Sequence, residues 1–293
     1  MQEHNSLYHP VQIGKLKLNG NLFLAPIAGY SDRAFRSLCL EYGASYCTTE
    51  MVSAEALTRG SKKTESLMLP APNEKAYAVQ IFGGVPEVMA NAAELVLERT
   101  PCTSIDINGG CPVPKIIKSG AGSSLTKDPD LLYRIVKAVK ERVSSKSNIP
   151  VTIKIRSGWD QSHITWKAKR IPVFGSGDAN TPETAKAMLE QTGCDGVMFA
   201  RGAMGDPFLF RRTRSYLLTG TYEKESIQER LKAGFRELNV NVKDRGEKAA
   251  CCLMRKKFCA YSSGIQGGAK LRQSVVQASS VQDYKDIFSA YLE

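Results

Sequence analysis

Residues 104–125 read SIDINGGCPVPKIIKSGAGSSL. The segment begins as a short apolar strand and breaks at residues 108–112, because glycine permits unusual backbone angles and proline has no amide donor. A polar amide, Asn108, and a thiol, Cys111, therefore stand at the carboxyl end of a strand, and a glycine-rich turn that carries Lys118 follows. This arrangement predicts an active-site loop. The alternative is that Cys111 is a small apolar side chain beneath a loop.

Short apolar segments recur on both sides of this loop, and segments with helical spacing separate most of them. After a small hairpin over 11–18, strands are expected at 21–24, 46–49, 76–82, 104–108, 151–155, 171–174 and 196–200. Strands that are apolar throughout are typical of a parallel sheet buried on both faces. Polar residues follow the strands all along the chain and not at one switch point. A TIM-type β/α barrel is therefore favoured over a doubly wound sheet.

The predicted barrel is one strand short, because a closed β/α barrel has eight strands and only seven are expected. The shortfall lies between Arg156 and Ile171. The fourteen residues 157–170 suffice for one crossover helix, but not for a further strand with its own helix. We therefore predict that one β/α segment is missing, and that the sheet either closes with seven strands or keeps unpaired edges.

The strand pattern ends near Thr219, and helices are expected at 223–242, 245–262 and 269–277. We predict two domains, a β/α barrel over residues 1–219 and an all-helical domain over residues 220–293. The helical part contains the basic run 255–257 beside Phe258 and Tyr261. Cations attract RNA phosphates and aromatic rings stack on bases, so this run suits RNA binding. By itself it could equally be a solvated helix face.

The composition narrows the class of protein. The net charge of +11 favours a polyanionic partner such as nucleic acid, although a generic basic surface would give the same value. No apolar run is long enough for a membrane span, and the first residues lack a signal-peptide pattern. The eight cysteines and three histidines show no zinc-binding spacing. These features predict a cytoplasmic protein with free thiols and no metal.

Taken together, these motifs resemble the tRNA-dihydrouridine synthases. The likeness covers most of the chain, and its most specific element is DINGGCP at 106–112, directly after a strand. The other matching segments are Ala25-Pro26, DRAFR at 32–36, VQIFG at 79–83, KSGAG at 118–122, KIRSGW at 154–159, Gly177-Asp178, RGA at 201–203 and MRKKFCAYSSGIQGGAKLR at 254–272.

The resemblance implies a β/α barrel that carries FMN, is reduced by NADPH, and has a helical domain that grips tRNA. Reduced flavin would give a hydride to one carbon of a uracil ring, and Cys111 would protonate the neighbouring carbon as general acid. The uridine would have to leave its base stack to reach the flavin.

The same resemblance implies roles for individual residues. Those expected at the cofactor are Ala25, Pro26, Gln80, Lys154, Gly177, Asp178, Arg201 and Gly202. Those expected at the tRNA are Asn108, Lys118, Arg156, Arg255 and Lys256, of which Asn108 would orient the substrate or the flavin edge beside Cys111.

The chain departs from the family pattern in the region where a strand is missing. The family has a strand there that ends in His-Gly-Arg-Thr, and neither that element nor its helix is present. His163 does not match it and is interpreted as an exposed helix residue, and Ser176 replaces the family's Asn. Three hypotheses follow for what we expect to be a monomer: an FMN- and NADPH-dependent enzyme acting on tRNA uridine, a flavin barrel oxidoreductase acting on a free pyrimidine, or a flavin-free tRNA-binding relative.

Overall fold

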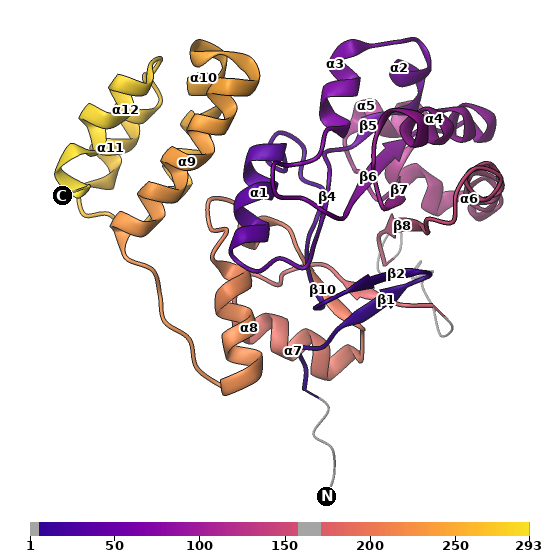
Figure 1. The fold of residues 1–293 in the computed structure, drawn as a ribbon, viewed down its shortest axis with the longest axis horizontal. Helices are drawn as coiled ribbons and strands as arrows, with labels where there is room; N and C mark the ends of the chain where they lie inside the picture. Colours follow the sequence, from indigo (N-terminus) through magenta and orange to yellow (C-terminus); the bar gives the residue numbers. More distant parts are fainter. Residues whose placement is uncertain (1–5, 158–170, 293) are drawn as a thin grey trace, which may run out of the picture.

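Apolar strands form a curled parallel sheet, helices pack around it, and a helical region lies to one side (Figure 1). The computed structural model describes residues 6–157 and 171–292. The predicted hairpin, β1 (Val11–Ile13) with β2 (Leu16–Leu18), is confirmed as an antiparallel pair.

The sheet follows the predicted strands closely. Its members are β3 (Leu22–Leu24), β4 (Tyr46–Thr48), β5 (Val52–Ser53), β6 (Tyr77–Phe82), β7 (Ser104–Gly109), β8 (Val151–Ile155), β9 (Phe174–Gly175) and β10 (Gly196–Phe199). The strand order is β8-β7-β6-β4-β3-β10-β9, all neighbours are parallel, and β5, which the sequence did not predict, pairs with β6. Since parallel strands end at the same edge, this order decides which strand-end residues become neighbours.

The sheet is a half-barrel with open edges within the described residues. β8 pairs there with β7 alone and β9 with β10 alone, so the second of the two predicted outcomes, unpaired edges, is observed. The expectation of a strand over 171–174 is wrong in extent. The N–H of Val173 donates to the carboxylate of Asp195 at 2.7 Å rather than to a strand carbonyl, and β9 begins only at Phe174. The interpretation of His163 and the predictions for 158–170 lie outside the described residues.

The helices around the sheet begin and end at recognisable signals. They are α1 (Arg33–Glu41), α2 (Ala54–Thr58), α3 (Lys62–Glu65), α4 (Pro86–Arg99), α5 (Pro114–Lys118), α6 (Pro129–Ser144), α7 (Pro182–Thr192) and α8 (Leu209–Thr219), with 3-10 turns at Ser66–Met68, Gly122–Lys127 and Arg201–Ala203. Asp32 starts α1 by accepting the N–H of Phe35 at 2.9 Å, and a left-handed Gly193 ends α7. The helix α8, which follows the last strand, was not among the predicted helices.

The helical region comprises α9 (Ile227–Arg245), α10 (Glu247–Tyr261), α11 (Gly268–Val275), α12 (Val281–Phe288) and a 3-10 turn at Ser289–Tyr291. Of these helices, α12 was not predicted. The apolar core of this region includes Leu38 of α1 and Phe208, so the helices pack directly on the barrel part. The division into two domains at residue 219 stays a prediction.

A buried ion cluster joins the helical region to the loop that follows β3. The ammonium of Lys257 donates to the carboxylate of Asp32 at 2.5 Å, to the carbonyl of Tyr30 at 3.2 Å, and to the carboxylate of Glu237. The hydroxyl of Tyr261 donates to the same Glu237 at 2.8 Å. Lys257 and Glu237 are both fully buried, so one lysine of α10 holds two carboxylates from different parts of the chain.

The cluster corrects the interpretation of the basic run 255–257. Lys257 is neither an RNA contact nor part of a solvated face, because it lies on the buried side of α10. Arg255 is half-buried, and its Nε donates to the carbonyl of Ala278 at 2.8 Å. Lys256 is exposed, and its ammonium lies 5.0 Å from the ring centre of Tyr30.

Glu237 makes the stability of this cluster depend on pH. Burial raises the pKa of Glu237 from 4.5 to about 7, although the neighbouring charge of Lys257 acts in the opposite direction. The folded protein thus keeps this proton at pH values where the unfolded chain has lost it. Its stabilising contribution is complete below pH 4.5 and is lost as the pH rises through about 7.

We therefore expect Glu237→Gln, which carries no ionisable group, to lack this dependence. The free energy of unfolding of wild type, measured by urea denaturation, should fall relative to that of E237Q between about pH 5 and about pH 7.5. Titration of all other groups is common to both proteins and largely cancels in the difference. A difference that stays constant over this pH range would contradict the prediction.

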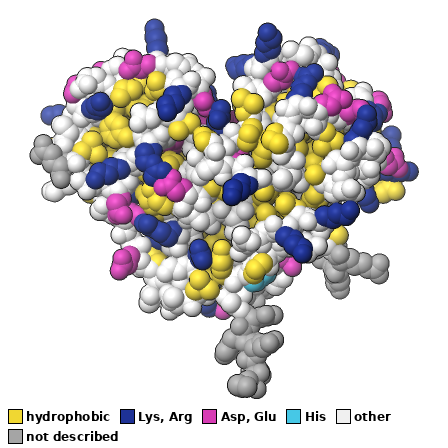
Figure 2. Space-filling model, in the orientation of Figure 1, with side chains coloured by type: hydrophobic (Ala, Val, Ile, Leu, Met, Phe, Trp, Pro, Cys, Tyr) yellow, Lys and Arg dark blue, Asp and Glu magenta, His cyan; other side chains and the backbone are white. Residues whose placement is uncertain are grey.

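The surface of the molecule carries its charge in a dispersed form. Figure 2 shows Lys and Arg side chains spread over both parts of the visible face, which is hollowed between the helical region and the barrel part. All eight cysteines are free, as predicted. No helix in the described part of the chain has the length and apolar character needed to cross a membrane.

Candidate active site

Three neighbouring strands carry polar side chains near their carboxyl ends. Gln80 of β6 is in register with Asp106 of β7, and Asp106 is in register with Thr152 of β8. One step further along, Asn108 is paired with Lys154. Because side chains alternate along a strand, residues two positions apart point to the same face, and these five side chains form one polar group.

Hydrogen bonds connect four of these side chains. The hydroxyl of Thr152 and the amide of Gln80 both donate to the carboxylate of Asp106, each at 2.6 Å. The amide nitrogen of Asn108 donates to the side-chain oxygen of Gln80 at 2.8 Å. The oxygen of Asn108 in turn accepts the backbone N–H of Cys111 at 3.0 Å and that of Gly110 at 3.2 Å. The loop that carries the thiol is therefore bonded to the polar group.

The two ionisable members of this group respond to burial in opposite senses. Burial raises the pKa of Asp106, and the hydrogen bonds from Thr152 and Gln80 partly offset this rise. Burial also lowers the pKa of Lys154, against the pull of the nearby Asp106. Lys154 has no hydrogen-bond partner among the described residues, so its amine is a free donor for a ligand acceptor at this strand end.

Cys111 lies where the sequence predicts it, directly after β7. It is half-buried, whereas Cys39, Cys47 and Cys102 lie in the apolar interior. Its carbonyl accepts the N–H of Ser123 at 2.9 Å. A Cβ at the left-handed Gly122 would lie 2.6 Å from that carbonyl oxygen, so the close approach requires glycine. The loop is thus held on both sides and the thiol stays accessible.

Two of the predicted substrate residues around this loop, Lys118 and Arg156, are exposed, whereas Asn108 is buried. Lys118 ends α5, and the turn after it packs against Gly84, where a Cβ would come within 2.8 Å of the Gly120 carbonyl. Arg156 follows β8, and its Nε donates to the carbonyl of Gly110 at 2.9 Å. Arg156 thus contacts the residue next to Cys111, and Lys118 ends the short helix that follows the loop. Lys256 lies against Tyr30 in the loop after β3, whereas Arg255 contacts the segment between α11 and α12.

The two predicted phosphate turns also meet, on the other side of the half-barrel. Arg201, after β10, pairs with Asp178, after β9, at 2.8 Å, and both side chains are exposed. Asp178 has a φ of 53°, the only positive φ of a non-glycine residue in the described part of the chain. A Cβ on Gly202 would lie 2.7 Å from the Cα of Asn180, so the turns touch closely.

Ala25 and Pro26 lie between these two groups, at the end of β3. The N–H of Ala25 donates to the carbonyl of Phe199 at 2.8 Å, which continues the pairing of β3 with β10. All the residues predicted at the cofactor therefore lie along one edge of the sheet. Sequence reasoning gave no role to Asp106 or Thr152. The signal was present, since each lies two positions before a predicted site residue in an otherwise apolar strand.

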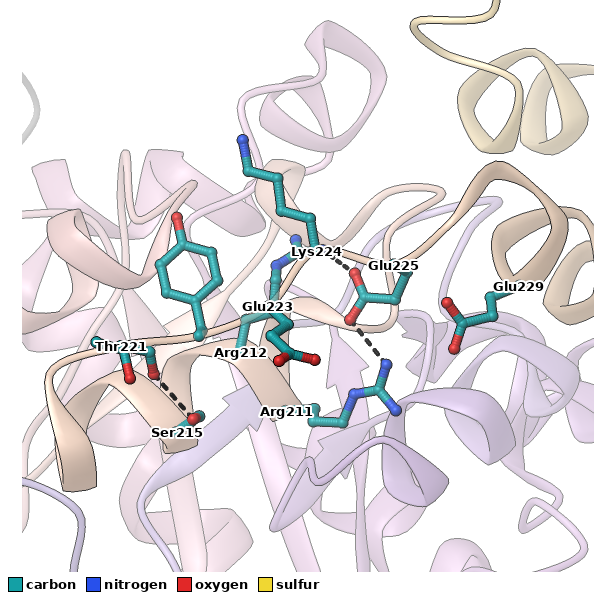
Figure 3. Close-up of a pocket in the computed structure, with 9 residues that line it drawn as sticks. Arg211, Arg212, Ser215, Thr221, Glu223, Lys224, Glu225 and Glu229 are labelled. Carbon is teal, nitrogen blue, oxygen red and sulfur yellow. Dashed lines mark hydrogen bonds and ion pairs between the residues drawn. The ribbon is translucent and has the colours of Figure 1, made fainter.

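A separate pocket of about 640 Å³ lies where α8 meets the connection to α9 (Figure 3). Three of the charged residues that line it are already paired: Glu225 binds Arg211 at 3.0 Å and Arg212 at 2.5 Å, and Arg212 also binds Asp206. It contains none of the predicted site residues. We interpret it as a structural junction that holds the connection between the barrel part and the helical region.

The comparisons with known proteins agree with this geometry. The family model for dihydrouridine synthases matches residues 23–168 and 164–292. A probable tRNA-dihydrouridine synthase of Treponema pallidum is 46% identical over 328 residues, which cover 97% of this chain and 96% of that protein. tRNA-dihydrouridine synthase B of Shewanella oneidensis is 36% identical over 249 residues, which cover 72% of this chain and 76% of that protein.

Similarity to a solved structure supports the fold alone. A 6-hydroxypseudooxynicotine amine oxidase of Pseudomonas geniculata superposes with a TM-score of 0.53 at 13% identity. The match covers 78% of this chain and 52% of the oxidase, so this chain spans about half the length of that protein.

The alignments also bear on the missing segment. The alignment to the Treponema pallidum protein extends over 328 positions, although this chain has 293 residues, so the relative contains sequence that this chain lacks. The family model matches in two parts that meet at residues 164–168, between β8 and β9, where the sequence predicts the loss of a β/α segment. With matches along almost its whole length on either side of that point, the chain belongs to the dihydrouridine synthase family.

Proposed function

We propose that this protein is a tRNA-dihydrouridine synthase, which uses FMN and NADPH to reduce uridine in tRNA to 5,6-dihydrouridine. The observation that carries the proposal is the half-buried thiol of Cys111 at the end of β7, held by Asn108 beside the donor Lys154. Membership of the dihydrouridine synthase family supports the reaction class. That the enzyme is cytoplasmic and monomeric stays a prediction from the sequence.

The donor set fits FMN at both ends of the molecule. The amine of Lys154 suits the polar edge of a flavin ring, with Ala25 and Pro26 behind it, whereas the amide of Gln80 is fully buried and already bonded to Asp106 and Asn108. The close pair of turns with Arg201 and its neighbours Gly177, Asp178 and Gly202 suits a phosphate, because backbone N–H groups and a guanidinium both bind phosphate oxygens. When bound, the flavin would supply the hydride chemistry.

The chain's own residues would provide position, charge and a proton. The thiol of Cys111 would donate its proton to the uracil carbon next to the one that is reduced. Asn108 would keep this loop in place through the N–H of Cys111. Lys118, Arg156 and Lys256 are exposed cations around the rim and would bind tRNA phosphates, so that an unstacked uridine can enter.

The test begins with the visible absorbance spectrum of the purified full chain, before and after addition of FMN. We expect flavin bands that survive gel filtration, and dihydrouridine in tRNA after incubation with NADPH. Protein that retains flavin but leaves all tRNA uridines unreduced would overturn the proposal.

One observation favours a second candidate, a tRNA-binding relative without flavin. The sheet has unpaired edges at β8 and β9 within the described residues, and the family's histidine element is absent from the sequence. Colourless protein that retains no added FMN, yet binds tRNA with an affinity that falls as salt rises, would support this candidate. Reduction of a free pyrimidine at a rate unaffected by deletion of the residues after Thr219 would instead support a small-molecule oxidoreductase.

A further inference from the structure

A row of four hydrogen-bonded side chains crosses β8, β7 and β6 and ends at the loop of Cys111. Its members in order are Thr152, Asp106, Gln80 and Asn108, joined by contacts of 2.6, 2.6 and 2.8 Å. Gln80 is fully buried, and Asp106 and Asn108 are buried as well. The row therefore lies out of water, where a hydrogen bond that is lost cannot be replaced at little cost.

The direction of every hydrogen bond in this row follows from Asp106. Asp106 accepts from both of its neighbours in the row, so Gln80 turns its NH₂ group toward Asp106 and its oxygen toward Asn108. Asn108 must then turn its NH₂ group toward Gln80 and its oxygen toward the N–H groups of Gly110 and Cys111. An amide side chain has nearly the same shape after a flip, so packing alone would not impose these orientations.

We infer that Asp106 is a positioning residue that sets the geometry of the Cys111 loop through Gln80 and Asn108. If Gln80 flipped, Asn108 would have to flip as well, and its NH₂ group would face two backbone N–H donors. Both hydrogen bonds to the loop, at 3.0 and 3.2 Å, would then be lost. The consequence for catalysis rests on the proposed function, whereas the control of loop geometry does not.

Thr152 supplies a sharp test because its hydroxyl can either donate or accept. In Asp106→Asn the new NH₂ group can donate to Thr152, so the oxygen still faces Gln80 and the row keeps its direction. In Thr152→Val alone, the carboxylate still accepts from Gln80. In the double variant D106N/T152V the NH₂ group finds no acceptor on the β8 side and can be satisfied only by reversing Gln80. The two changes should therefore be strongly non-additive.

The decisive measurement is amide hydrogen exchange at Gly110 and Cys111 in the full-length protein, which does not require activity. We expect D106N and T152V each to stay close to wild type, and D106N/T152V to exchange at least about tenfold faster at these two amides. Asn108→Ala removes the acceptor itself and therefore gives the upper limit of the exchange rate at these two amides. Exchange in the double variant equal to the sum of the single effects would overturn the inference.

A kinetic readout then connects the row to the reaction. Given the proposed function, D106N/T152V should lower kcat for dihydrouridine formation and leave KM for tRNA nearly unchanged. The single variant D106N should keep most of the wild-type kcat. If wild type itself forms no dihydrouridine, the proposed function fails while the exchange experiment still decides the inference. If exchange rises as expected but kcat does not fall, Asp106 shapes the loop without serving the reaction. The part of the inference that concerns catalysis is then refuted.

Discussion

Cys111→Ala lowers the rate of dihydrouridine formation by about 100-fold or more, which is the usual contribution of a positioned general acid. The loop itself should keep its shape, because the Asn108 and Ser123 contacts involve the backbone of residue 111 and not its thiol. The flavin spectrum and the thermal midpoint should therefore match those of wild type. The measurement is the initial rate of dihydrouridine formation in tRNA at saturating NADPH.

Cys252→Ala is the matched control, because Cys252 is an exposed thiol on α10 of the helical region and not at a strand end of the sheet. It should react at the wild-type rate. A C111A protein that keeps more than about a tenth of the wild-type rate would show that the proton comes from another group, since a lost general acid costs more than this.

Lys257→Met destabilises the protein by about 3–5 kcal/mol, the range found when one partner of a buried ion pair is removed. The substitution leaves the carboxylates of Asp32 and Glu237 without their shared cation inside the interface between α10 and the loop after β3. The free energy of unfolding, measured by urea denaturation at neutral pH, gives the effect directly. Flavin retention should fall too, since Asp32 follows Ala25 and Pro26 in the same loop.

Lys256→Met is the control for stability, because this neighbouring lysine is exposed and should shift the free energy of unfolding by no more than about 0.5 kcal/mol. The double variant K257M/E237Q should recover part of the loss, because glutamine, unlike Glu237, does not have to take up a proton to be neutral once Lys257 is gone. Equal stability of K257M and wild type would mean that the ion cluster contributes nothing to holding the helical region on the barrel.

Much of the fold and of the candidate site was predictable because the relevant signals are local. Apolar segments of strand length, the break at residues 108–112 and the glycine turns after β9 and β10 depend only on backbone preferences and burial. They place Cys111, Lys154 and Arg201 at strand ends before any contact is known. The missing strand was also visible, because the number of residues between Arg156 and Ile171 limits what the segment can hold.

Other features depend on partners that are distant in the chain. Nothing near Lys257 in the sequence separates it from the exposed Lys256, and its burial follows from Asp32, 225 residues away along the chain, and from Glu237 on the neighbouring helix. The strand over 171–174 is shorter than predicted because the Asp195 side chain takes the N–H of Val173.

The strands, the loop with Asn108 and Cys111 and the membership of a family could be read without coordinates, because each follows from short motifs and apolar periodicity. The open edges of the sheet, the burial of Lys257 and the row from Thr152 to Cys111 became visible only in the folded chain. These features arise from the register between strands and from charges that must find a partner once they are removed from water.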